Sequence, residues 1–320
     1  MKKYICGIDI GGTKIAVSLG STKGKVLSRT IFSSLGGKKV RESISQIDLA
    51  ISELLSEYKL TKRDLLGVGV AVPGAIDPIT QILVKSPNLP SWEGVPLKKA
   101  LTQKIKLPVS VENDANAAAL GELFFGAGKH SKDFIYITVS TGIGSGIVVN
   151  GVLVRGAKGT AGEVGHMTMV KNGNLCGCGK KGCLEAYSSG TAIASYVKNK
   201  LKNGFKSKFF KNIKLNNITG ILVAKAAKEN DRLAIESRVL AADYLGIALA
   251  NLINLLNPEK IILGGGVMEQ SHHFWQPMMS AARREAWPIA FKSCQIVCSE
   301  LGKYVTDLGA MALVMEKNKH

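Results

Sequence analysis

One order of elements occurs twice in this chain and limits the folds available to it. Residues 4–10 form an apolar segment that runs into a glycine turn, and two strand-like segments follow across a short turn. Residues 134–155 repeat this order of strand, glycine turn, strand, turn and strand. One repeat offset by roughly 130 residues indicates two related domains rather than a solenoid. We therefore expect two similar α/β domains.

The segments around the two copies carry patterns typical of helices and strands. Apolar residues recur at helical spacing over 41–58, and Asn113 or Asp114 suits the N-cap of an alanine-rich helix. Further strands are expected at 65–72, 109–112, 260–263 and 294–299, and further helices at 218–229, 232–256, 276–286 and 307–316. The alternation supports an α/β class.

Composition favours an intracellular enzyme. The chain has 320 residues, of which 46% are hydrophobic, enough for two domains. The longest apolar stretch, 245–256, is shorter than the roughly 20 residues that cross a membrane, and the first residues do not resemble a secretory signal. We therefore expect a cytoplasmic protein without a membrane partner.

The net charge of +18 raises the question of nucleic-acid binding. Seven lysines lie between Lys198 and Lys214 with no acidic residue among them and three phenylalanines interleaved. A nucleic-acid patch would show this composition, but no nucleic-acid-binding motif accompanies it. We expect a solvated helix pair here, and a charge that favours anionic small molecules.

A group of cysteines and a histidine predicts a metal site. His166, Cys176, Cys178 and Cys183 lie within 18 residues, with glycines that let the chain turn around one point. Four such ligands suit tetrahedral zinc and leave no coordination position open, so the predicted site is structural. The other three cysteines lie on strand-like segments and are expected to be buried thiols.

Two carboxylates, Glu163 and Glu185, flank the expected zinc site. Either could be an ordinary surface residue. Alternatively, a rigid metal site would hold both carboxylates so that they accept hydrogen bonds from the hydroxyls of a polyol.

Three glycine-rich turns follow strands. Gly11 and Gly12 could let backbone N–H groups approach phosphate oxygens, and Thr13 and Lys14 would add a hydroxyl and a charge. The second copy at Thr141 and Gly142 strengthens this interpretation. A hairpin turn would also explain the first copy, which lacks the spacing of a Walker loop. The third turn contains Gly265 and Gly266, which suit either close approach of a nucleotide or a tight strand-to-helix turn.

Asp114 follows a strand and begins a helix. It could be a helix cap. It could also be a general base, because the helix dipole keeps such a carboxylate ionised and phosphoryl transfer requires chiefly an ionised, well-placed base.

Together these motifs resemble the ROK family of repressors and sugar kinases. The resemblance rests, in chain order, on Asp9-Ile-Gly-Gly-Thr-Lys, Pro73-Gly74, Glu112-Asn-Asp-Ala-Asn, Thr141-Gly-Ile-Gly, Gly162-Glu-Val-Gly-His, Cys176-Gly-Cys-Gly-Lys-Lys-Gly-Cys-Leu-Glu and Leu263-Gly-Gly-Gly. It implies a two-lobed, actin-like (ribonuclease-H-like) ATPase fold with duplicated βββαβα-type domains. The expected smaller lobe is 1–114 plus about 302–320, and the larger lobe, 115–301, carries the zinc site.

The resemblance also implies roles for single residues. Asp114 would be the catalytic base that takes the proton of a sugar 6-hydroxyl. Substrate hydroxyls would be bound by Asn113, Glu163, His166 and Glu185, with His166 also binding zinc through its other ring nitrogen. ATP and Mg²⁺ would be bound by Asp9, Gly11, Gly12, Thr13, Lys14, Thr141, Gly142, Gly265 and Gly266.

The implied activity is ATP-dependent phosphorylation of a hexose, with glucose and a glycolytic role expected first. N-acetylglucosamine, N-acetylmannosamine, fructose and allose remain alternatives, since sequence spacing does not measure the pocket. A sugar-responsive repressor is the other alternative, although the first strand begins at Tyr4 and leaves no room for a preceding helix-turn-helix. A homodimer or homotetramer is expected by analogy.

Overall fold

The computed structural model describes residues 3–34, 40–86, 88–270 and 272–318. Contacts divide the chain into two compact units. Unit 1 comprises Met1–Lys132, Gly146–Gly162 and Ser299–His320, and unit 2 comprises Asp133–Ser145 and Glu163–Cys298. By these contacts the helix that begins at Asp114 belongs to unit 1, whereas the expected lobe boundary assigns it to the larger lobe.

Unit 1 is built on a five-stranded sheet with the order β3-β2-β1-β4-β7. Its strands are β1 (Tyr4–Ile10), β2 (Lys14–Ser21), β3 (Val26–Ser33), β4 (Leu65–Val72) and β7 (Val109–Asn113). The first three form the predicted antiparallel meander, and β1, β4 and β7 run parallel. A two-stranded sheet of β5 (Ala75–Ile76) and β6 (Leu83–Lys85) follows β4.

Helices cover the sheet of unit 1. Strand residue Ile8 packs in one cluster with Ile47 of α1 (Val40–Glu57) and Leu101 of α2 (Leu97–Ile105). A second cluster joins Ile5 to Met311 of α11 (Val305–Lys317). Alternate residues of a strand point to opposite faces, so Ile5 and Ile8 place these clusters on opposite faces of β1.

The second sheet has the order β10-β9-β8-β11-β12, which matches that of unit 1 position by position. Its strands are β8 (Phe134–Val139), β9 (Ile143–Val149), β10 (Val152–Leu153), β11 (Lys260–Gly264) and β12 (Gln295–Cys298). As β1, β4 and β7 do, β8, β11 and β12 run parallel. The internal repeat predicted from the sequence is therefore confirmed.

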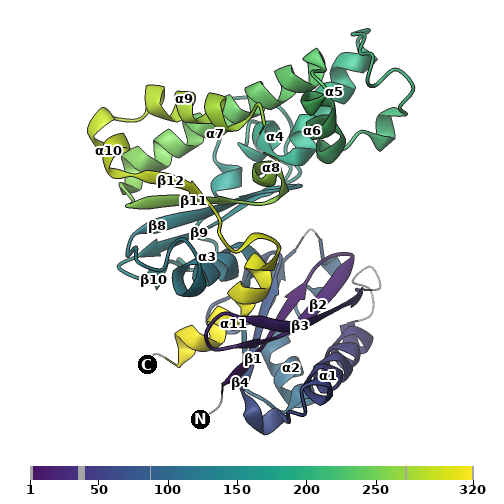
Figure 1. Cartoon of the computed structure of the whole chain (residues 1–320), viewed down its shortest axis with the longest axis vertical. Coiled ribbons are helices and arrows are strands. Elements are labelled where there is room, and N and C mark those ends of the chain that lie inside the picture. Colours follow the sequence, from purple (N-terminus) through teal and green to yellow (C-terminus); the bar gives the residue numbers. More distant parts are fainter. Residues whose placement is uncertain (1–2, 35–39, 87, 271, 319–320) are drawn as a thin grey trace. The chain divides into compact units, whose positions relative to one another are not determined.

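The remaining elements are one further α-helix of unit 1, the helices of unit 2, and 3₁₀ turns in both units. The α-helices are α3 (Asp114–Phe125), α4 (Glu185–Ser188), α5 (Gly190–Lys202), α6 (Gly220–Lys228), α7 (Arg232–Leu256), α8 (Gly266–Glu269), α9 (Trp275–Glu285) and α10 (Pro288–Ser293). The 3₁₀ turns are Lys62–Asp64, Pro90–Trp92, Val164–His166, Leu215–Asn217 and Gly302–Tyr304. Helices α7 and α9 run side by side (Figure 1).

Helix α7 is long and apolar enough to cross a membrane by length and composition alone, and half of its most apolar window is buried within the protein. Leu245, Leu249 and Ile253 are fully buried. A core helix shows the same length and hydropathy, because it too must match apolar surroundings.

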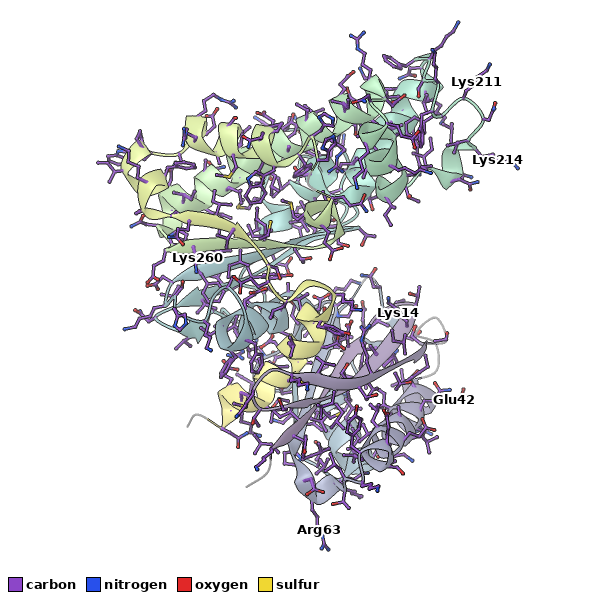
Figure 2. The ribbon with its side chains drawn as sticks, viewed as in Figure 1. Lys14, Glu42, Arg63, Lys211, Lys214 and Lys260 are labelled. Carbon is purple, nitrogen blue, oxygen red and sulfur yellow. The ribbon has the colours of Figure 1, made fainter. Side chains whose placement is uncertain are left out.

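The lysine-rich segment differs from the predicted helix pair. Helix α5 ends at Lys202, and the chain continues through turns to Leu215. Of the three phenylalanines, Phe210 is buried, and Lys211 and Lys214 extend outward from the protein (Figure 2). Glycine and asparagine at 203–204 end the helix, which periodicity alone does not reveal.

Strand β4 packs closely against α11. A Cβ atom on Gly69 would lie 1.6 Å from the backbone oxygen of Ala310, whereas one on Gly67 would first meet a methyl group of Val314 at 3.1 Å. A backbone oxygen in a packed helix cannot move aside as a side chain can.

We therefore expect Gly69→Ala to destabilise unit 1 by about 1–3 kcal/mol, as overpacking does, and Gly67→Ala to cost much less. Thermal unfolding of both variants measures the difference. Equal melting temperatures for the two variants would contradict this account of the β4–α11 contact.

Candidate functional site

In unit 1 the predicted site residues lie where parallel strands end. Asp9 of β1 pairs in register with Ala71 of β4, which pairs with Glu112 of β7. Asn113 and Asp114 follow directly. Ligands of open α/β sheets bind outside the carboxyl ends of the strands, so this edge is a candidate binding site.

The start of α3 separates the roles of Asn113 and Asp114. The Asn113 side-chain oxygen accepts hydrogen bonds from the N–H groups of Ala115 (2.9 Å) and Asn116 (3.1 Å), and its amide donates to the carbonyl oxygen of Gly74 (3.0 Å). Asn113 is therefore the N-cap, and Asp114 is the first helical residue. Asp114 accepts from the N–H of Ala115 at 2.9 Å and is half-buried. The helix dipole favours its ionised form.

A second carboxylate, Asp9, lies in the same strand-end region. Burial raises the pKa of Asp9 to about 7, with smaller contributions from the negative charges of Asp114 and Asp307. The positive charges of Arg29 and Lys14 act in the opposite direction. Bringing a cation to Asp9 would favour its ionised form.

The β1–β2 turn presents the residues expected to bind phosphate. The N–H of Gly11 donates to the carbonyl oxygen of Lys14 (2.9 Å), which closes the turn. A Cβ atom on Gly12 would lie 2.8 Å from the backbone oxygen of Asn88, so only glycine fits there. Thr13 is exposed, as is Lys14 (labelled in Figure 2), and a hydroxyl and a cation are therefore available to an anion.

In unit 2 the four predicted metal ligands converge. Their ligand atoms lie within 4.8 Å of one another. The Cys178 and Cys183 sulfurs are 3.8 Å apart, and the Cys176 sulfur is 3.7 Å from Nδ1 of His166. Ligands about 2.3 Å from a tetrahedral zinc ion are separated by roughly 3.8 Å. The four residues therefore fit a Zn²⁺ ion in type and in spacing.

The carboxylates beside this cluster have different surroundings. Glu185 accepts from the N–H of Ile143 at 2.9 Å, and its other oxygen lies 3.7 Å from the Cys176 sulfur. Glu163 is more than half exposed, and its Oε2 lies 3.9 Å from Nε2 of His166. Nδ1 of His166 faces the cysteines, and its Nε2 therefore points toward Glu163. Glu163, His166 and Glu185 therefore form one group.

The second glycine turn is joined to this group. The Glu185 oxygen that accepts from Ile143, Oε2, lies 2.5 Å from the position of a Cβ atom on Gly142, so a larger residue would displace the carboxylate. Ser140 is fixed through the hydrogen bond that its carbonyl oxygen accepts from the N–H of Gly190 (2.7 Å). Thr141 remains exposed.

Unit 2 also contains a cavity of about 430 Å³, a volume typical of small-molecule sites. Thr141 and Gly266, both predicted to bind nucleotide, line it, together with residues of α5, α6 and α7. Its polar groups include Lys198, Asn216 and Gln270. These residues were not predicted, because they come from three separate elements and none belongs to a local nucleotide-binding motif.

Gly265 and Gly266 differ in their roles. Gly265 has a φ of +90°, and a Cβ atom there would lie 2.5 Å from the backbone oxygen of Val139. Gly266 meets nothing within 4 Å and borders the cavity. Gly265 thus permits the tight turn after β11, whereas Gly266 leaves space for a ligand.

Arg238, in the second turn of α7, supports the same wall of the cavity. Its buried guanidinium donates to the carbonyl oxygens of His272 (3.0 Å) and Gln270, the residue that ends α8. Burial lowers the pKa of Arg238 to about 10. No local signal in the sequence marks Arg238, because the first half of α7 also contains Arg232, Glu236 and Asp243.

Each unit thus gathers part of the predicted site. Unit 1 holds Asp9, Asn113 and Asp114 with the Gly11–Lys14 turn, and unit 2 holds the metal ligands, their two carboxylates and the cavity.

Known proteins resemble the whole chain. The model of the ROK family matches residues 5–317. A glucokinase of Halalkalibacterium halodurans is 35% identical over 98% of this chain and 96% of its own length. A xylose repressor of Caldicellulosiruptor bescii is 33% identical over 97% of this chain and 78% of its own. Among solved structures, a ROK glucokinase of Streptomyces griseus in complex with glucose and AMPPNP has a TM-score of 0.81 and 33% identity, covering 98% and 99% of the two chains. The two-domain pattern, the Cys₃His cluster and these matches agree: the chain belongs to the ROK family.

Proposed function

We propose that this protein is an ATP-dependent hexose kinase that phosphorylates the 6-hydroxyl of glucose. The observation that carries the proposal is the start of α3, where Asn113 performs the capping and Asp114 is a half-buried carboxylate at the strand ends. Glucokinases with full-length similarity, and the glucose and AMPPNP complex of one relative, support this activity.

In the proposed reaction the sugar 6-oxygen forms a bond to the γ-phosphorus of ATP while Asp114 accepts the proton of that hydroxyl. The bond from that phosphorus to the bridging oxygen breaks, and ADP leaves. Because the transition state is loose, placing the hydroxyl in line matters more than strong basicity. A general base of this kind contributes about 10²–10⁴-fold to the rate.

The adenosine portion would lie in the cavity of unit 2, against Gly266, where Gly265 permits the turn after β11. Thr141 and Gly142 would bind phosphate oxygens, as would the turn from Gly11 to Lys14. Asp9 would help to hold Mg²⁺, an ion that neutralises charge developing on the phosphates when it is bound.

The sugar would be held by Asn113, Glu163, His166 and Glu185. A carboxylate oxygen can accept two hydroxyl hydrogen bonds, which suits adjacent ring hydroxyls. A closed zinc site at His166, Cys176, Cys178 and Cys183 would supply rigidity, fixing the His166 ring so that Nε2 faces the substrate. A glycolytic role, a cytoplasmic location and a homodimer or homotetramer remain predictions.

A second candidate function is a sugar-responsive repressor, because similar chains include xylose repressors. Sequence-selective DNA binding by the purified protein at physiological salt would favour it over the kinase. Binding that weakens steeply with salt and ignores sequence would reflect only the positive charge.

We expect Asp114→Asn to lower kcat by about 10²–10⁴-fold while the Kd for glucose changes little, measured by coupled assay and calorimetry. Asp64→Asn is the matched control, since Asp64 is a genuine capping carboxylate, bonded to the N–H of Thr61 at 2.8 Å. If the kcat of Asp114→Asn stays within about tenfold of the parent value, Asp114 is a structural residue and not the general base.

Cys178→Ala is expected to lose zinc and to weaken glucose binding together, because the remaining ligands no longer fix His166. Metal analysis and calorimetry on the same sample provide the two values. Cys298→Ala, an exposed cysteine outside the cluster, should change neither. Full zinc content in Cys178→Ala would disprove the ligand set.

A panel of sugars tests the substrate. We expect kcat/KM to be highest for glucose among glucose, N-acetylglucosamine, N-acetylmannosamine, fructose and allose. If either N-acetylated sugar gives a higher kcat/KM than glucose, that sugar is the substrate and the protein is still a sugar kinase.

A further inference from the structure

A buried carboxylate supports the start of α3 from behind. Glu112, the residue before the N-cap, is 5% exposed. Its Oε1 accepts hydrogen bonds from the N–H of Asn113 (3.0 Å) and from the side-chain amide of Asn116 (3.2 Å). These partners lie on either side of Asp114, so the position of the Glu112 carboxylate sets the backbone from which Asp114 projects.

Glu112 has a cationic partner from a distant segment. Nε of Arg155 lies 2.6 Å from its Oε2. The two terminal nitrogens of Arg155 contact Glu316 of α11, at 2.7 and 3.3 Å. Such a forked contact fixes the plane of the guanidinium, which a lysine ammonium cannot reproduce. Arg155 is thus held by α11 while it pairs with Glu112.

Loss of this cation would change the surroundings of Asp114. A buried carboxylate that loses its counter-charge is disfavoured in place and turns toward water. Turning toward water breaks the hydrogen bonds that Glu112 accepts from Asn113 and Asn116. The junction between β7 and α3 would then lose its fixed geometry, although no atom of Arg155 is itself part of the reaction.

We propose that Arg155 is a positioning residue for catalysis: it holds Glu112 from the α11 side and so fixes the carboxylate of Asp114 at the phosphoryl-transfer site. The inference rests on the proposed role of Asp114. Removing Arg155 is therefore expected to lower kcat more than it changes substrate affinity, because a misplaced catalytic group slows the chemical step.

The test compares Arg155→Ala and Arg155→Lys with the parent protein in steady-state kinetics at saturating ATP. We expect kcat of Arg155→Ala to fall by about 10–100-fold, the scale of a small misplacement, with KM for glucose within about threefold. Millimolar guanidinium chloride should restore part of the lost kcat, whereas equal sodium chloride should not. Arg155→Lys should fall between the parent and Arg155→Ala.

The matched control is Lys62→Ala, which removes a comparable half-buried ion pair of unit 1, between Lys62 and Asp48 at 2.7 Å. It should keep the parent kcat and show no response to guanidinium. An unchanged kcat in Arg155→Ala, or a loss that guanidinium does not restore, overturns the proposal. Should Arg155→Ala fail to fold, a parental kcat in Arg155→Lys overturns it instead.

The two proposals fail separately. If Asp114→Asn retains activity, the site assignment is wrong whatever Arg155 does. If Asp114→Asn is inactive and the Arg155 variants keep the parent kcat, only the positioning role is wrong.

Discussion

The structure of the candidate site depends on the junction between β7 and α3. There the side chain of Asn113 caps the helix by accepting from the N–H groups of Ala115 and Asn116, and the carboxylate of Asp114 shares the N–H of Ala115 without being the cap. A capping side chain is fixed by the backbone that it serves. Because Asn113 serves as the cap, the sheet edge presents an ionisable group beside the dipole of α3. Asp9 at the end of β1, and Glu112 with Arg155 behind the junction, then surround that group with further charges.

Much of the architecture follows from local patterns in the sequence. The repeated strand and glycine-turn order predicted two like sheets, and both have the same strand order. The spacing of His166 and the three cysteines predicted a cluster that the fold does bring together. These signals are reliable because each depends on residues near one another in the chain, where periodicity and short turns limit the geometry.

Other features could not be predicted, because they depend on residues far apart in the sequence. Arg155 and Glu316 are paired across 161 positions, and no local pattern relates them. The cavity in unit 2 takes Lys198, Asn216 and Gln270 from separate elements. The choice between Asn113 and Asp114 as N-cap depended on the carbonyl oxygen of Gly74, which the fold places beside Asn113. The lysine-rich segment was misjudged because its composition fits a helix as well as it fits turns.

Phosphoryl transfer from ATP to a hexose 6-hydroxyl can be followed directly by ³¹P NMR of the purified protein with ATP, Mg²⁺ and glucose. We expect ADP and glucose 6-phosphate to appear in equal amounts, and ATP to remain stable when glucose is omitted. Release of inorganic phosphate without a sugar phosphate, or no consumption of ATP at all, would contradict this expectation.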